Sequence, residues 1–414
     1  MSAFGIELTR LMTAKGIGVH EFARMSHYSA GYISNLRSGK KTPAPGTAAE
    51  FDALLRADGQ LLAALRPAES GMSAAYGRQF LDEMTSHVIE LGRLAELTNI
   101  GDGTIEQLND TVDHIARDHL SSPPEPLIRR AADVNGRVLE LLREQQRLRH
   151  TRDLYLIGAK ASALLSALCG DLGQQRGAAA HARTALILGQ EAGHSGAVAL
   201  ALSAMSRVAF WDGRRKRAAD LARRGYEICP PNSTRVLLAC QEADAADVPA
   251  AQEAISRAAR AEYEVADEDD LPVLYSCGRA RRSCYTMTFH LRAGQPVKVL
   301  TAAATADEAN RAGEDCQYGT WAQVQMSAAL AHLGNGAVDG AADRLAPVLA
   351  LPSDMRLATF DDKLARTLAL LSHSGYRGNA GARDLAGEID GYLVGRKVGI
   401  MAYPLAIEKG NRST

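Results

Sequence analysis

The sequence predicts an all-α protein in which a small N-terminal helical domain precedes a long array of paired helices. Three observations favour this fold class. The 414 residues are 46% hydrophobic but only 5% aromatic, a composition that suits helices and offers few strand formers. Apolar residues recur at spacings of three and four through most of the chain, as on the buried side of a helix. Glycine-containing turns also recur at regular intervals in the later part of the chain, which indicates structural repeats.

Residues 1–67 are expected to form a five-helix domain. Apolar residues such as Phe4, Leu8 and Phe51 fall on one side of each expected helix and would share a common core. The first and the last two of these helices are expected over residues 4–15, 47–55 and 59–65.

Two helices joined by a tight turn are expected over residues 22–39. Ser29 stands where the second helix would begin, and its hydroxyl can accept a hydrogen bond from a free backbone N–H group there. Within that helix, Tyr32, Ile33 and Leu36 form one inward stripe. Gly39 ends the helix, because a basic loop with a proline follows it.

The charge pattern of this segment is uneven. No Asp or Glu occurs over residues 22–49, a span that holds several Arg and Lys residues. The whole chain has 47 Lys and Arg against 48 Asp and Glu, a formal net charge of −1. A local basic patch on a nearly neutral chain indicates a surface that faces phosphate groups. The alternative is a small helical bundle with a solvated basic face.

Residues 4–66 resemble the repressor-like helix-turn-helix (XRE) family of phage repressors and their bacterial relatives. They are most similar to members that also carry a large helical repeat domain. Two positions depart from the family pattern. His27 stands where the family usually has Gly in the turn, and Arg37-Ser38-Gly39 replaces Glu-Arg-Gly, so that a common internal ion pair is missing. The matching residues are Phe22, Ala23, Tyr28, Ser29, Tyr32, Ile33, Ser34, Leu36 and Gly39.

The resemblance implies a domain that binds double-stranded DNA as a homodimer, on half-sites one helical turn apart. The second helix of the pair would then be the recognition helix, and the amide of Asn35 could pair bidentately with adenine. Ala30 and Gly31 are short, so DNA shape is expected to supply part of the selectivity. The residues assigned to base edges are Ser29, Ala30, Gly31, Ser34 and Asn35, and those assigned to phosphates are Arg24, Tyr28, Arg37, Lys40 and Lys41.

Residues 68–149 are expected to form a helical linker and a candidate dimerisation region. A stretch of small residues over 66–73 leads into a helix over 76–97. A longer helix is expected over residues 127–149, where apolar residues keep a four-three rhythm. This stripe could pair with a second copy as in a coiled coil, or pack on the next helices of the same chain. The second interpretation is favoured, because three heptads are short for a coiled coil.

Residues 150–394 are expected to form helical repeats. Gly173 and Gly213 are 40 residues apart, and Gly294 and Gly336 are 42 residues apart. The 81 residues between Gly213 and Gly294 would hold two units, one of them diverged. This pattern resembles a tetratricopeptide-like α-solenoid, a curved stack of helix pairs with a concave face. The remaining segments are an acidic loop over residues 262–270 and a C-terminal tail over residues 395–414.

The resemblance further implies that the repeats sense a signal. In the peptide-pheromone-responsive regulators of Gram-positive bacteria, a repeat array of this type binds a short peptide on its concave face. The alternatives are a small-molecule ligand, a protein partner, or a dimerisation scaffold. Trp211 and Trp321 are expected to pack between repeats. Alignment of the glycine turns places Lys160, Ser203, Arg207, Arg281, Thr288 and Gln323 on the concave side.

Other classes of function have little support in the sequence. The chain has no metal-binding H-E-x-x-H motif, no G-x-S-x-G nucleophile motif and no phosphate-binding Walker loop. We therefore expect no enzyme, no catalytic residue, no metal and no cofactor. The six cysteines show no zinc-ligand spacing, and no long apolar run or signal peptide is evident, so a cytoplasmic protein is expected. The alternative function is an interaction scaffold whose N-terminal domain is an adaptor without an operator.

Overall fold

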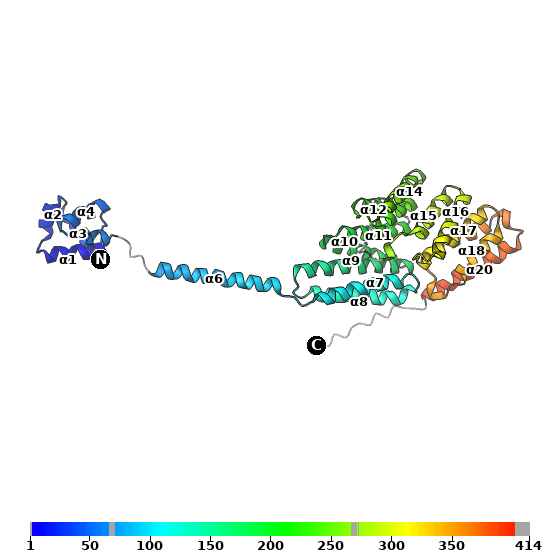
Figure 1. The fold of residues 1–414 in the computed structure, drawn as a ribbon, viewed down its shortest axis with the longest axis horizontal. Coiled ribbons are helices and arrows are strands. Elements are labelled where there is room, and N and C mark those ends of the chain that lie inside the picture. The colour runs from blue at the N-terminus through cyan, green and yellow to red at the C-terminus, as the bar shows by residue number, and fades with distance from the viewer. Residues whose placement is uncertain (1, 66–70, 266–270, 272, 402–414) are drawn as a thin grey trace. The chain divides into compact units, whose positions relative to one another are not determined.

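The computed structural model describes residues 2–65, 71–265, 271 and 273–401, with the backbone alone described for residues 71–82 and 396–401. These residues form helices and no strand, which confirms the all-α fold class (Figure 1). The chain divides into two compact units, residues 1–94 and 95–414. Most of the expected 66–73 linker, the end of the expected acidic loop and the tail beyond Met401 lie outside the described residues.

Five short helices form a domain at the start of the first unit, with bounds close to those expected (Figure 1). Ser2 and Ser29 cap the first and third helices by accepting hydrogen bonds from Gly5 N and Tyr32 N, each at 3.1 Å. Gly39 ends the third helix in the left-handed region, with φ 76°. The helices are α1 (Ala3–Ala14), α2 (Val19–Ser26), α3 (Ala30–Ser38), α4 (Pro45–Leu54) and α5 (Gln60–Ala63). Their shared core includes the fully buried Leu8, Phe22, Ile33, Leu36, Phe51 and Leu61.

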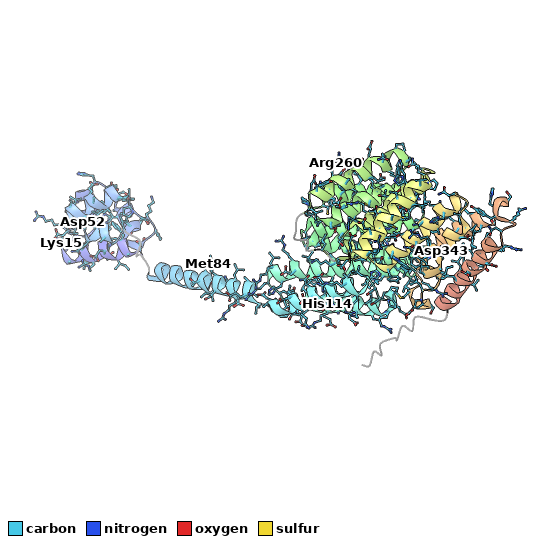
Figure 2. The ribbon with its side chains drawn as sticks, turned by 45° about the vertical axis from the view of Figure 1, so that its right-hand side comes forward. Lys15, Asp52, Met84, His114, Arg260 and Asp343 are labelled. Atoms are coloured by element: carbon cyan, nitrogen blue, oxygen red, sulfur yellow. The ribbon has the colours of Figure 1, made fainter. Side chains whose placement is uncertain are left out.

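Asp52, on α4, holds the loop that joins α4 to α5 (Figure 2). Its carboxylate accepts hydrogen bonds from the backbone N–H groups of Gly59 at 2.6 Å and Leu61 at 2.8 Å. Arg56 and Asp58 in this loop have positive φ values of 42° and 48°. Such a conformation costs an L-residue roughly 1–2 kcal/mol. The buried carboxylate therefore stabilises a loop whose backbone would otherwise relax.

The long helix expected over residues 127–149 is two helices. α8 (Pro124–Leu142) ends at a turn, and α9 (Leu148–Asp171) begins after it. The turn forms because the side-chain amide of Gln146 donates to the carbonyl groups of Leu141 and Glu144. The apolar stripe of α8 is buried in one core together with α7 (Asp102–Asp118) and α9. The four-three rhythm is thus explained by packing on neighbouring helices of the same chain, the interpretation favoured over a coiled coil.

The second unit stacks antiparallel helix pairs into a solenoid-like array (Figure 1). The turns within four of the pairs contain Gly173, Gly213, Gly294 and Gly336, with φ values of 66° to 77°. The diverged pair uses Asp247 instead, whose side chain caps the second helix. The pairs are α9 with α10 (Gln175–Glu191), α11 (Ser195–Trp211) with α12 (Arg215–Ile228), α13 (Ser233–Ala245) with α14 (Val248–Tyr263), α15 (Arg279–Arg292) with α16 (Pro296–Arg311), and α17 (Tyr318–Gly334) with α18 (Val338–Leu349). α19 (Asp361–Leu371) and α20 (Ala380–Met401) follow, so the last helix runs past the expected boundary at residue 394.

A repeated hydrogen bond marks the first two pairs. The hydroxyl of Ser166 donates to the carbonyl of Ala178 at 2.9 Å, and the hydroxyl of Ser206 donates to the carbonyl of Ala218 at 2.8 Å. Both alanines are fully buried, and each stands five residues after the glycine of its turn. Their small side chains let the two helices of a pair approach closely, as expected.

The segment that precedes the array contacts the last helix pair. The backbone N–H of Tyr318, at the start of α17, donates to the carbonyl of Leu120 at 2.8 Å. His119, at the end of α7, is 2.9 Å from Asp171 Oδ2 through its Nε2 atom and 3.2 Å from the amide nitrogen of Gln317. We call these residues the end-to-end contact. It joins His119 to Gln317, which is 198 residues away in sequence.

α9 also has the length and hydropathy of a membrane-spanning helix. Within its most apolar window, 67% is buried inside the described structure, where it packs on α8 and α10.

Candidate functional site

The turn between α2 and α3 keeps a left-handed residue. His27 ends α2 with φ 60° and ψ 19°, the region that glycine adopts most easily. His occupies this region more readily than most non-glycine residues. The substitution of Gly by His therefore leaves the expected turn in place, and Ser29 begins α3 two residues later.

The five residues assigned to base edges all lie at the start or on the outer side of α3. Gly31 and Ser34 are exposed, and Ala30 and Asn35 are half-buried. Ser29 is exposed, but its oxygen already accepts the capping bond from Tyr32, so it would meet DNA as a hydroxyl donor. Ile33 and Leu36 face the core, whereas Tyr32, expected to point inward, is only half-buried.

The five residues assigned to phosphates divide into two groups. Arg24, Lys40 and Lys41 are exposed, and the ammonium of Lys41 lies 5.7 Å from the ring centroid of Tyr32. Arg37 and Tyr28 are half-buried and have structural partners. The three exposed residues are free to meet phosphate groups, and we call them the basic triad: Arg24, Lys40 and Lys41.

Arg37 and Tyr28 bind other parts of the domain. Arg37 Nε donates to the hydroxyl of Thr9 on α1 at 3.2 Å. Tyr28 stacks on Tyr32 with ring centroids 5.1 Å apart, and its hydroxyl is 3.3 Å from Thr47 Oγ1. The missing internal ion pair is thus replaced by a bond between Arg37 and α1.

Gly31 has no packing reason to be glycine, because a Cβ atom there would meet nothing within 4 Å. Replacing Gly31 with Ala should stabilise the domain by about 1 kcal/mol, since glycine is unfavourable inside a helix. We expect the same substitution to weaken DNA binding about tenfold, because the methyl group holds the helix away from the bases. Thermal denaturation and DNA titration would measure the two effects. Gly136→Ala on α8, also without neighbours, is the control and should leave DNA binding unchanged. Unchanged DNA affinity in Gly31→Ala would contradict close backbone approach.

A cavity of about 220 Å³ lies inside the second unit. Its walls come mainly from the first helix of each pair, namely α9, α11, α13, α15 and α17, together with α19. Two short 3₁₀ segments, η1 (Val273–Tyr275) and η3 (Ala358–Phe360), complete it. His119, Asp171 and Gln317 of the end-to-end contact also line the cavity, so this contact is part of its wall.

Four of the six residues expected on the concave side line this cavity: Arg207, Arg281, Thr288 and Gln323. Lys160 and Ser203 are not among the residues that line it. Ser203 points to α13, where its hydroxyl lies 3.0 Å from Gln241 Oε1. Lys160 precedes the cavity-lining residues of α9 by about two turns, or roughly 9 Å along the helix.

An aromatic cluster surrounds one arginine of the cavity. The guanidinium carbon of Arg207 lies 4.6 Å from the ring centroid of Phe210, 5.2 Å from Trp211 and 5.8 Å from Tyr285. Arg207 also donates to Asp244 Oδ2 at 3.0 Å. Burial works to lower the pKa of Arg207, but Tyr285 and Asp244 outweigh it and raise the pKa above its ordinary value. The side chain is thus a fixed cation, and Trp211 lines the cavity in addition to packing.

Lys363 is one of the cavity residues that sequence reasoning missed. It is 9% exposed and lies on α19. Burial lowers the pKa of this lysine. A signal was present, because Phe360 and Thr367, about one turn before and after Lys363, and its neighbour Leu364 are buried. A lysine on that side of a helix is unusual, since lysine is almost never buried without a partner.

No curated protein and no solved structure matches the chain. Residues 3–65 match the family model described as the helix-turn-helix domain, and these residues are the ones that form α1 to α5. The chain therefore carries a helix-turn-helix DNA-binding domain at its N-terminus.

Proposed function

We propose that the protein is a cytoplasmic, homodimeric transcriptional regulator whose helical array receives a signal. The observation that carries this proposal is the joining of two features in one chain. One is a helix-turn-helix domain with a basic surface free of acidic residues over residues 22–49, and the other is a helical array with a polar cavity. The first suits binding to an operator, and the second suits a peptide or small-molecule ligand.

The mechanism follows from the thermodynamics of two states. Two copies of α3 must be spaced one helical turn of DNA apart to bind an inverted repeat. A ligand in the array would favour one of two dimer geometries, of which only one fits the operator. It can shift that equilibrium only by the difference between its affinities for the two states. Helix pairs with glycine turns, similar to those of tetratricopeptide arrays in peptide-responsive regulators, support this part of the proposal.

The proposed dimer contact is α6 (Gly71–Glu96), because the stripe on α8 is used inside the chain. Met84 lies on α6 (Figure 2). Met84, Val88 and Leu91 have exposed fractions of 47%, 63% and 67%, and they repeat at spacings of four and three. An exposed apolar stripe with this spacing is typical of a helix that pairs with a second copy. The additional exposed Ile89, Leu94 and Leu97 extend the apolar surface.

Replacing Met84, Val88 and Leu91 together with Gln should convert the dimer to a monomer. Loss of three apolar side chains from each helix removes the contact that would hold a short coiled coil. Analytical ultracentrifugation would show the fall in mass. The affinity for an inverted repeat should fall as well, because a monomer binds only one half-site. Glu90→Gln with Arg93→Gln on the same helix is the control, because it removes one charge of each sign and no apolar side chain. A triple variant that stays dimeric would place the interface elsewhere.

The test of the function as a whole is selection of bound sequences from a random DNA pool by the full-length protein. An inverted repeat is the expected result. Absence of enrichment, both in the full chain and in a fragment of residues 1–94, would favour the alternative in which the domain is an adaptor in a scaffold. Enrichment by the fragment alone would mean that the array inhibits DNA binding until its ligand is present.

A further inference from the structure

The cavity wall has an excess of positive charge. It contains six Arg or Lys residues and three Asp residues. A concave wall with one prevailing sign of charge concentrates the field and attracts ions of the opposite sign. The cations come from four helices, α11, α12, α15 and α19: Arg207, Arg215, Arg281, Arg292, Lys363 and Arg366.

Several of these cations bind neutral oxygen atoms. Arg292 donates to the carbonyl groups of Ala243, Asp244 and Ala246 at 2.7–3.1 Å. Arg281 donates to the carbonyl groups of Leu274 and Ser276. These carbonyl groups accept hydrogen bonds but leave the charge of both side chains uncompensated, and Arg292 Nε has no hydrogen-bond partner in the described residues. The wall therefore stays cationic.

Lys363 is the most informative of them. Its ammonium donates to Ser327 Oγ at 2.6 Å and lies 3.3 Å from the carbonyl oxygen of Gln323. An ammonium has three N–H donors, so these two neutral partners leave one donor unused. A buried ammonium without an anionic partner is costly, and a protein normally pairs it. Binding of an anion in the cavity would supply that partner.

Asp244, another charged residue of the cavity wall, has one carboxylate oxygen without a hydrogen-bond donor. It is 5% exposed, and its Oδ2 atom accepts from Arg207, while its Oδ1 atom has no hydrogen-bond partner in the described structure. A buried carboxylate oxygen without a donor costs free energy of the same order as a lost hydrogen bond. Because this oxygen is covered by the protein, the carboxylate acts as the partner of Arg207 inside the wall.

We propose that the cavity binds a small organic acid, whose carboxylate pairs with Lys363 and whose body lies against the aromatic cluster of Phe210, Trp211 and Tyr285. The cavity of about 220 Å³ is smaller than the roughly 300–1,000 Å³ of drug-sized sites, so it fits a small acid or a single terminal residue of a peptide. This inference rests on the proposed function only in taking the cavity as the ligand site.

The test compares acids with their neutral amides in the full-length protein. The probes are phenylacetate, hydrocinnamate and N-acetylphenylalanine, each with its primary amide, and short peptides ending in Phe with a free or an amidated C-terminus. Each acid should bind at least about tenfold more tightly than its amide, the gain of one charge-assisted hydrogen bond. Tight binding of the peptides alone would assign the carboxylate to a peptide terminus, and tight binding of the small acids alone would assign it to a free acid.

Substitution of Lys363 locates the preference. In Lys363→Met, which keeps a straight side chain of similar volume, the acid and its amide should bind equally. Removal of an unpaired buried charge should leave the melting temperature unchanged or raise it. Lys363→Gln serves as the second variant if the first fails to fold. Equal binding of acid and amide in the native protein, or no binding of any probe up to about 10 mM, would overturn the inference.

The fluorescence of Trp211 identifies the site directly. The chain has two tryptophans, and only Trp211 lines the cavity, whereas Trp321 packs on the core of α17 to α20. A fluorescence change on acid binding should disappear in Trp211→Phe and persist in Trp321→Phe. DNA affinity measured with and without the bound acid separates the two proposals. Acid binding without a change in DNA affinity would retain the cavity assignment and reject its role as a signal.

Discussion

Replacing Asp52 with Ala should destabilise the helix-turn-helix domain by about 3 kcal/mol, because two backbone N–H groups would lose a charged acceptor. These groups belong to Gly59 and Leu61, in a loop that already contains two non-glycine residues with positive φ. A domain of about 60 residues has only a few kcal/mol to lose. Amide hydrogen exchange of the full-length protein would show the destabilisation as a loss of protection of about 100-fold in α1, α3 and α4.

Asp58→Asn is the matched control for this prediction. Asp58 lies in the same loop with φ 48°, is exposed, and donates or accepts none of the bonds that hold Gly59 and Leu61. Asn tolerates the left-handed conformation as well as Asp does. The hydrogen-exchange protection of Asp58→Asn should therefore match that of the native protein. Equal protection in Asp52→Ala and Asp58→Asn would mean that the carboxylate of Asp52 does not determine the loop.

Replacing the basic triad, Arg24, Lys40 and Lys41, with Gln should reduce the slope of log affinity against log salt by about 2.7, since each neutralised phosphate contributes about 0.9. If counterion release is the only contribution of the three contacts, DNA affinity at about 0.1 M salt would fall roughly 500-fold. Titration of an operator fragment at several salt concentrations gives both quantities. The base sequence preferred by the variant should stay the same, because phosphate contacts carry no sequence information.

Arg37→Gln is expected to behave differently from the triad. Its Nε atom binds Thr9, so the substitution should lower the stability of the domain and change the salt slope by less than one phosphate contact would. Lys15→Gln, at the end of α1 and outside residues 22–49, is the neutral control. A triad variant with an unchanged salt slope would remove the phosphate surface from this part of the domain.

Local chemistry explains what the sequence could predict. The caps of α3, Ser29 and Gly39, and the four glycine turns of the array depend on residues close together in the chain. The break after α8 was missed for a related reason. The apolar rhythm continues through it, and the turn is held by side-chain bonds of Gln146 and by bonds from Asn99 to Leu141 and Gln145.

The cavity could be predicted only in part, because it depends on contacts between distant segments. Arg207, Arg281, Thr288 and Gln323 share the inward side of their own helices, which periodicity reveals. Lys363 lies beside Gln323 and Ser327 because α19 packs on α17. Gln317 joins the wall through the end-to-end contact, and no spacing in the sequence encodes that approach.

The end-to-end contact also changes how the array should unfold. In a linear repeat protein each pair contacts only its neighbours, so terminal pairs fray first and stability is a sum of local contributions. Here the loss of α17 would break its bonds with Leu120 and His119 as well as those with its sequence neighbours. The helices from α7 to α17 are therefore connected at both ends, whereas α18 to α20 follow beyond this contact. The helices from α7 to α17 should unfold as one cooperative unit, and their folding should be slowed by the large loop that must close first.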